Sequence, residues 1–169
     1  MIHIYYGDGK GKTTSAMGLA LRALGQGLSV TVAQFLKDGK SGEIEPLKNL
    51  GATIICDSQP MPFTWQMSES QREAACKRMK NVFEKALQSA ENSCLIVLDE
   101  ALCAMQMNML RSSDIIKFLQ TTKAEVVLTG SVTEKDIATL IDYADYVSEI
   151  KKHKHPYDSG MTARRGIEY

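Results

Sequence analysis

The stretch Ile2-His-Ile-Tyr-Tyr-Gly-Asp-Gly-Lys-Gly-Lys-Thr-Thr14 decides the fold. Residues 2–6 are rich in β-branched and aromatic side chains, which predicts a strand. Apolar residues then recur at three- and four-residue spacing from Ala16 to Leu24, which predicts a helix that we expect Gly25 to end. A glycine-rich segment between a strand and a helix is the context that a phosphate-binding loop requires, because its backbone N–H groups and the helix N-terminus converge on an anion.

We expect this loop to bind the phosphates of a nucleotide. Within it, Lys12 supplies a point charge and the Thr13 hydroxyl is suited to holding Mg²⁺. The usual loop has four residues between its first glycine and the Gly-Lys pair, whereas only three intervene here. A shorter loop must follow a different path, so the usual nucleotide orientation does not follow from it. The predicted nucleotide-binding residues are Gly7, Asp8, Gly9, Lys10, Gly11, Lys12, Thr13 and Thr14.

Two consecutive acidic residues form a candidate metal-binding position. The run Cys94-Leu-Ile-Val-Leu98 is apolar throughout, as expected of a strand buried on both faces, and Asp99 and Glu100 follow it directly. In open α/β sheets, ligands collect at the carboxyl ends of parallel strands. We therefore expect Asp99 and Glu100 to be direct or water-mediated partners of Mg²⁺ beside Thr13.

Strand and helix patterns alternate along the rest of the chain. Further strands are predicted at 29–34, 52–56, 125–129 and 146–150, and helices at 69–90, 114–120 and 137–143. This alternation predicts one α/β domain over residues 1–169, with a mostly parallel sheet flanked by helices, of the P-loop NTPase-like (RecA-like) kind. Residues 151–169 show no clear period and carry a local excess of positive charge, so we expect a tail folded over the site; a solvated tail is the alternative.

Composition narrows the class of protein. Twenty basic and 20 acidic residues give a formal net charge of zero among 169 residues, which argues against a dedicated nucleic-acid or anionic-membrane binder. No apolar run approaches the roughly 20 residues that span a bilayer, and no signal segment is recognisable. The four cysteines show neither zinc-site nor disulfide-framework spacing. We expect a cytoplasmic protein.

Over nearly its whole length the sequence resembles the P-loop-type ATP:corrinoid adenosyltransferases. Members of this family convert cobalamin and its precursors to their 5′-deoxyadenosyl forms. The short loop is moderately specific by itself, and the combination of motifs is specific. The resemblance is carried by Gly7–Thr14, Ala20-Leu-Arg-Ala-Leu-Gly25, Val32-Ala-Gln-Phe35 with Lys37, Phe63-Thr-Trp65, Val97-Leu-Asp-Glu100, Thr129-Gly130, Ala144-Asp145 and Ala163-Arg-Arg-Gly-Ile-Glu-Tyr169.

The resemblance implies an enzyme that transfers the 5′-deoxyadenosyl group of ATP to the Co(I) of a corrinoid and releases inorganic triphosphate. Its catalytic residues would be Lys12, Thr13 and Glu100, with Mg²⁺ on Thr13 and Glu100 and with Asp99 in its outer sphere. Phe63 and Trp65 match the motif that removes the lower axial ligand of cobalt. A flavoprotein reductase that supplies the electron for Co(II) and a second copy in a homodimer are the implied protein partners.

The sequence departs from the family pattern in two places. Many relatives have an arginine where this chain has Ser131, and some carry an N-terminal helical extension over the corrinoid. The present sequence starts on its first predicted strand, so we expect other residues to close the corrinoid site. Two alternative functions stay open at this point: a P-loop kinase or NTPase, and a carrier that binds ATP and a corrinoid without turnover.

Overall fold

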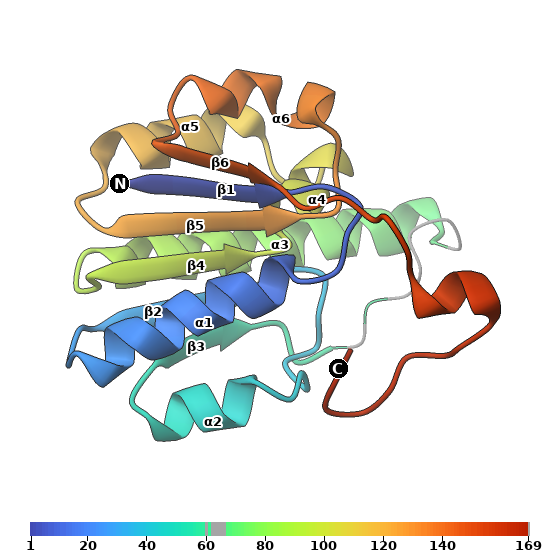
Figure 1. The fold of residues 1–169 in the computed structure, drawn as a ribbon. Helices are drawn as coiled ribbons and strands as arrows, with labels where there is room; N and C mark the ends of the chain where they lie inside the picture. Colours follow the sequence, from blue (N-terminus) through green and yellow to red (C-terminus); the bar gives the residue numbers. More distant parts are fainter. Residues whose placement is uncertain (60, 62–66, 169) are drawn as a thin grey trace.

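A computed structural model describes residues 1–59, 61 and 67–168 of the chain. The fold is a three-layer α/β arrangement in which one sheet lies between two layers of helices (Figure 1). Phe63 and Trp65, the predicted corrinoid-binding residues, lie outside the described residues. Among the described residues, no helix is long and apolar enough to cross a membrane.

The sheet has six strands, all of them parallel, in the order β3-β2-β4-β5-β1-β6. This arrangement confirms the predicted α/β class and is consistent with a P-loop NTPase-like fold. All six carboxyl ends lie at one edge of the sheet (Figure 1). The strands are β1 Ile2–Tyr6, β2 Val30–Gln34, β3 Thr53–Cys56, β4 Leu95–Asp99, β5 Glu125–Gly130 and β6 Tyr146–Glu149.

Helices cover both faces of the sheet. On one face lie α1 (Lys12–Gly25) and α2 (Ile44–Asn49), which pack on β2 and β4 through one apolar cluster. A larger cluster joins the other face to α3 (Glu69–Ala90), α4 (Ala101–Gln106), α5 (Ser112–Thr121) and α6 (Glu134–Ile141). A short 3-10 helix, η2 (Pro156–Ser159), interrupts the C-terminal segment.

The central strand β4 shows why the sheet needs both helix layers. Leu95 and Val97 pack into the cluster under α1, whereas Ile96 and Leu98 pack into the cluster under α3 and α4. All five residues of β4 are buried, as its continuous apolar run predicts. The strand therefore delivers its last residue, Asp99, to the carboxyl edge of the sheet with no exposed surface.

Local signals mark the start of α3 and the end of α1. A capping box begins α3: the Gln71 N–H donates to Ser68 Oγ at 3.3 Å, and the Ser68 N–H donates to Gln71 Oε1 at 2.9 Å. The helix α1 ends at Gly25 as expected, although its C-cap residue is Gln26 and the left-handed glycine that follows is Gly27, with φ 73°. No pattern recognised in the sequence predicts α2 or α4.

The glycine loop between β1 and α1 packs directly against the chain that leaves β6. The Gly9 N–H donates to the Ile150 carbonyl oxygen at 2.7 Å, and the Lys152 N–H donates to Asp8 Oδ1 at 2.9 Å. A Cβ at Gly9 would lie 2.7 Å from that carbonyl oxygen and 2.8 Å from the Lys151 carbonyl carbon. Glycine at this position therefore permits a close approach of two backbones.

We predict opposite effects for two glycine-to-alanine substitutions. Gly9→Ala forces the loop away from residues 150–152, and overpacking of this kind costs about 1–3 kcal/mol of unfolding free energy. Gly18→Ala lies within α1, where a Cβ meets nothing within 4 Å, so alanine should stabilise the protein by about 0.5–1 kcal/mol. Urea unfolding monitored by circular dichroism measures both. Equal stability of the two variants would contradict the close-approach account.

Candidate functional site

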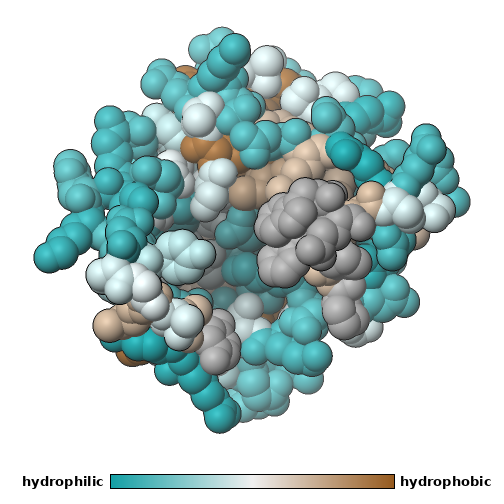
Figure 2. Space-filling model, turned by 90° about the vertical axis from the view of Figure 1, so that its right-hand side faces the viewer, coloured by the Kyte–Doolittle hydropathy of each residue, from teal (hydrophilic) through white to brown (hydrophobic). Residues whose placement is uncertain are grey.

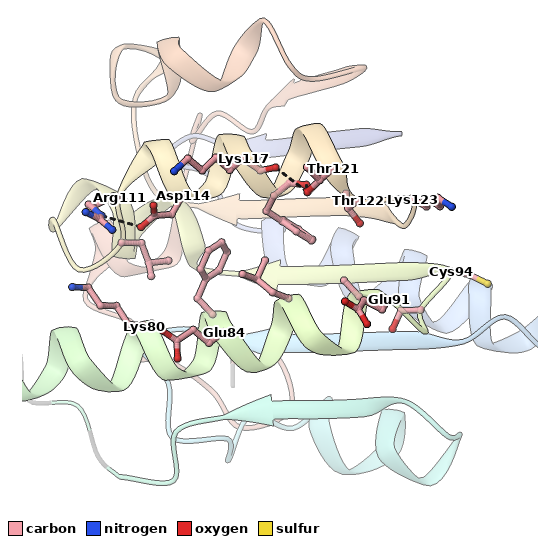
Figure 3. Close-up of a pocket in the computed structure, with 16 residues that line it drawn as sticks. Lys80, Glu84, Glu91, Cys94, Arg111, Asp114, Lys117, Thr121, Thr122 and Lys123 are labelled. Atoms are coloured by element: carbon pink, nitrogen blue, oxygen red, sulfur yellow. Dashed lines mark hydrogen bonds and ion pairs between the residues drawn. The ribbon is translucent and has the colours of Figure 1, made fainter.

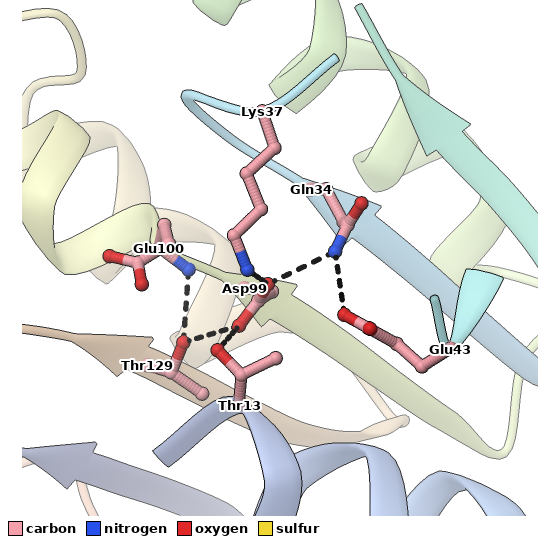
Figure 4. A network of polar contacts seen from close by, with 7 residues as sticks. All are labelled: Thr13, Gln34, Lys37, Glu43, Asp99, Glu100 and Thr129. Atoms are coloured by element: carbon pink, nitrogen blue, oxygen red, sulfur yellow. Dashed lines mark hydrogen bonds and ion pairs between the residues drawn. The ribbon is translucent and has the colours of Figure 1, made fainter. Parts of the chain in front are cut away.

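The site is built around Asp99, the last residue of β4. Its carboxylate is fully buried and accepts hydrogen bonds on both oxygens. Oδ1 accepts from the hydroxyls of Thr13 and Thr129, each at 2.8 Å. Thr13 belongs to the first turn of α1 and Thr129 to β5, so one carboxylate oxygen joins the helix behind the glycine loop to two neighbouring strands (Figure 4).

The other oxygen of Asp99 faces β2 and the turn after it. Lys37 Nζ lies 2.7 Å from Oδ2, and Gln34 Nε2 donates to the same oxygen at 3.3 Å. The strand register explains the second contact, because Gln34 pairs with Asp99 across β2 and β4. Gln34 Nε2 also donates to Glu43 Oε1 at 3.3 Å (Figure 4).

Lys37 stays charged in this environment. Burial opposes the charged form, but the carboxylates of Asp99, Glu100 and Glu43 and the hydrogen bond to Asp99 outweigh burial, so the pKa of Lys37 is raised. Asp99 thus has a permanent positive partner within the chain, as a buried carboxylate requires.

A left-handed turn directs Glu100 away from Asp99. Glu100 adopts φ 62° and ψ 16°, and its N–H donates to Thr129 Oγ1 at 2.9 Å. The Cys103 thiol, one turn further along α4, accepts a hydrogen bond from the Ser131 N–H at 3.0 Å. Burial, followed by the charge of Glu100, raises the pKa of Cys103 to about 12, so this thiol is protonated at neutral pH.

The glycine loop folds back on itself. Gly7 and Gly11 have φ of 113° and 120°, conformations that residues with a Cβ rarely adopt. Lys12 is buried and donates from Nζ to the Gly9 carbonyl oxygen at 2.6 Å. α1 begins at Lys12, so its first backbone N–H groups have no preceding helical carbonyl to bond.

Four of the residues described above line one pocket of about 850 Å³ at the carboxyl edge of the sheet: Thr13, Lys37, Glu43 and Glu100. Figure 2 views the molecule from this side and shows a largely hydrophilic surface with a hydrophobic area above its centre. The pocket is lined by Thr13, Thr14, Met17, Leu36, Lys37, Asp38, Ser41, Gly42, Glu43, Met61, Glu100, Gly166, Ile167 and Glu168. Polar and charged groups of the loop and strand ends therefore lie in the same pocket as apolar side chains.

The C-terminal segment forms one wall of this pocket through Gly166, Ile167 and Glu168. Glu168 is held by Arg164, whose guanidinium lies 3.0 Å from Glu168 Oε1 and whose N–H donates to Oε2 at 2.8 Å. These hydrogen bonds lower the pKa of Glu168 to about 2. Residues 166–168 thus line the same pocket as Thr13 and Thr14.

A larger pocket of about 1260 Å³ lies between α3 and α5 (Figure 3). Its walls include Lys80, Glu84, Asp114 and Lys117, and its lining contains none of the predicted site residues. We place the candidate site in the smaller pocket because the loop and the acidic strand end meet there.

Of the predicted site residues, Thr13, Thr14 and Glu100 line the pocket, and Asp99 lies directly behind Thr13. Lys12 lies in the loop and points back to Gly9. The sequence motifs indicate no individual role for Lys37, Gln34 or Thr129. All three lie in stretches that carry the family resemblance, and that was the available signal for them.

The fold and this pocket define an α/β protein with a polar site at the carboxyl edge of a parallel sheet. A family profile described as ATP:corrinoid adenosyltransferase BtuR/CobO/CobP matches residues 1–169. The chain therefore belongs to the ATP:corrinoid adenosyltransferase family, and it is an enzyme that transfers an adenosyl group.

Curated relatives agree with this assignment. The corrinoid adenosyltransferase CobA of Salmonella typhimurium is 32% identical over 172 residues, which cover 100% of this chain and 85% of the relative. A corrinoid adenosyltransferase of Sinorhizobium is 31% identical over 174 residues, covering 100% of this chain and 80% of that protein. The corrinoid adenosyltransferase of Escherichia coli K12 is 31% identical over 172 residues, with coverage of 100% and 85%.

The role of Thr129 is testable by two substitutions. Thr129→Val removes a hydroxyl that donates to Asp99 and accepts from the Glu100 N–H, which leaves that N–H without its partner and Asp99 Oδ1 with Thr13 alone. We expect a loss of about 1–3 kcal/mol of unfolding free energy. Thr129→Ser keeps the hydroxyl and should lose less. If urea unfolding ranks serine below valine, the hydroxyl does not stabilise the site.

Proposed function

We propose that this protein transfers the 5′-deoxyadenosyl group of ATP to the Co(I) centre of a corrinoid and releases inorganic triphosphate. The product is adenosylcobalamin or an adenosylated precursor. The observation that carries the proposal is the meeting of Thr13, Glu100 and the glycine loop beside the buried carboxylate of Asp99.

The loop is proposed to hold the triphosphate. Support comes from the N-terminus of α1, whose backbone N–H groups and dipole favour an anion. The Gly9 N–H already bonds Ile150, so the amides that remain for phosphate are those near the helix start. Lys12 lies within this loop, and its ammonium can exchange the Gly9 carbonyl for a phosphate oxygen.

The residues present fit a magnesium ion. Thr13 and Glu100 offer oxygen ligands to one pocket, and oxygen is the ligand that Mg²⁺ prefers. The Thr13 hydroxyl donates a hydrogen bond to Asp99, which leaves the lone pairs of its oxygen available to a cation. No cluster of three or more His, Cys, Asp or Glu side chains suited to a metal occurs among the described residues, which accords with a metal held mainly by substrate phosphates. When bound, Mg²⁺ supplies charge neutralisation of the triphosphate.

The proposed reaction does not require a nucleophile from the protein. The electron pair of Co(I) forms the bond to the ribose C5′, the C5′–O5′ bond breaks, and that pair leaves on inorganic triphosphate. The enzyme must then align two reactants and stabilise a highly charged leaving group. Lys12, the loop amides, Thr13 and Glu100 are the residues to which we assign that task.

We assign the corrinoid side to Phe63 and Trp65. Apolar side chains that displace the lower axial ligand leave cobalt four-coordinate and easier to reduce. Met61, two positions before Phe63, lines the pocket that holds Thr13 and Glu100, which supports a corrinoid near the same place.

The remaining proposals concern the closure of the pocket, the partner proteins and the cellular location. Residues 151–169 are proposed to close the pocket, with support from Ile167 and Glu168 in its wall. From the family resemblance we further propose a flavoprotein reductase as electron donor, a homodimer and a cytoplasmic location.

An anaerobic assay with ATP, Mg²⁺ and chemically reduced cob(I)alamin tests the function. We expect a light-sensitive adenosylcobalamin spectrum with one triphosphate per corrinoid converted. ADP or orthophosphate without a spectral change would indicate a kinase or NTPase instead. Binding of both substrates without any product would indicate a carrier.

Lys12→Ala should lower turnover in this assay by about 100-fold or more, because it removes a charge from the leaving group. The control is Lys48→Ala on the exposed side of α2, which should keep wild-type turnover. Circular dichroism checks that both variants fold. Near-wild-type turnover of Lys12→Ala would show that the loop does not hold the triphosphate.

Phe63→Ala and Trp65→Ala should reduce turnover more when the corrinoid enters as Co(II) with a reductase than when it enters as Co(I). The reason is that these side chains are assigned to the reduction step and not to the transfer. Parallel assays with the two cobalt states measure the difference. Equal losses in both assays would contradict the assignment.

A further inference from the structure

The turn after β2 places a lysine over the carboxyl edge of the sheet. β2 ends at Gln34, and Leu36 then adopts a left-handed backbone with φ 58°. Its N–H donates to the sulfur of the buried Met79 in α3 at 3.4 Å. A left-handed leucine is unfavourable and persists where the surrounding structure holds it, often at a functional site. The conformation directs the next residue, Lys37, toward the end of β4 (Figure 4).

The Lys37 ammonium has donors left for a ligand. It lies 2.7 Å from Asp99 Oδ2, and its side chain is 27% exposed whereas that of Asp99 is 0% exposed. An ammonium carries three N–H donors, and the described structure gives it one hydrogen bond, to Asp99. Lys37 also lines the pocket together with Thr13 and Thr14. Its charged end therefore contacts both the buried carboxylate and the pocket.

The charges that line the pocket explain why a second lysine is needed to bind a triphosphate there. Four of its lining residues are acidic and would repel a triphosphate: Asp38, Glu43, Glu100 and Glu168. Lys12 is only 7% exposed, and its ammonium bonds the Gly9 carbonyl oxygen. Lys37 brings a cation into the pocket from the strand side, opposite the start of α1.

Building on the proposed function, we propose that Lys37 is a second phosphate-binding residue, which donates to the triphosphate of bound ATP and to the departing triphosphate. Asp99 positions the ammonium and accepts one of its hydrogen bonds throughout. The rival account is that Lys37 only neutralises the buried charge of Asp99. The two accounts differ in what happens when Asp99 loses its charge.

Calorimetric titration with tripolyphosphate and with ATP, each with Mg²⁺ and without corrinoid, gives the first test. Lys37→Met should weaken tripolyphosphate binding by about tenfold or more, as expected for one charge-assisted hydrogen bond. Lys40→Ala is the matched control: its side chain lies in the same turn, is 77% exposed and is not part of the pocket lining, so it should bind as wild type. Wild-type affinity of Lys37→Met would overturn the inference.

The variant Lys37→Met leaves Asp99 without its cation and can lose stability for that reason alone. A comparison of Asp99→Asn with the double variant Lys37→Met/Asp99→Asn removes this ambiguity, because neither contains a buried unpaired carboxylate. We expect the two to unfold at similar urea concentrations, with the double variant binding tripolyphosphate about tenfold more weakly. Equal affinity of the two would establish the rival account. If the wild-type protein binds neither tripolyphosphate nor ATP, the proposed function itself fails.

Discussion

The structure depends on the neutralisation of one buried carboxylate. Asp99 ends the central strand without any contact with water, and an isolated charge in that position would cost several kcal/mol. Four donors from four places in the sequence remove this cost: Thr13, Gln34, Lys37 and Thr129. The same contacts fix the start of α1, the end of β2 and the end of β5 relative to one another. Stability and the shape of the pocket therefore have a common origin.

Much of the fold could be predicted because it follows from local pattern. Every predicted strand appears within a residue or so of its place, since each is a short apolar run between turn signals. The six-residue helices α2 and α4 could not be predicted, because so few residues show no helical period. The Lys37–Asp99 contact joins residues 62 positions apart and arises from the pairing of β2 with β4. The spacing of residues along the sequence therefore does not predict this contact. The roles of Phe63 and Trp65 stay predictions.

The arrangement suits a reaction in which the protein contributes position and charge. Family membership makes the transferred group an adenosyl group, and the attacking atom in the proposed reaction belongs to the corrinoid. The chain then has to hold one charged ligand firmly beside a second, apolar one. The pocket offers hydroxyl, carboxylate and ammonium groups at the strand ends, and Met17, Met61 and Ile167 nearby. Residues 166–168 of the C-terminal segment also line this pocket, although they are far in sequence from Thr13 and Thr14.

A crystal structure of the protein with ATP and Mg²⁺ tests the central claim most directly. The claim is that the network around Asp99 and the glycine loop together hold a triphosphate at the carboxyl edge of the sheet. The account predicts electron density for the triphosphate between the start of α1 and Lys37, with the metal on Thr13 and Glu100. Density for ATP in the pocket between α3 and α5, or with its adenosine end in the glycine loop, would contradict it.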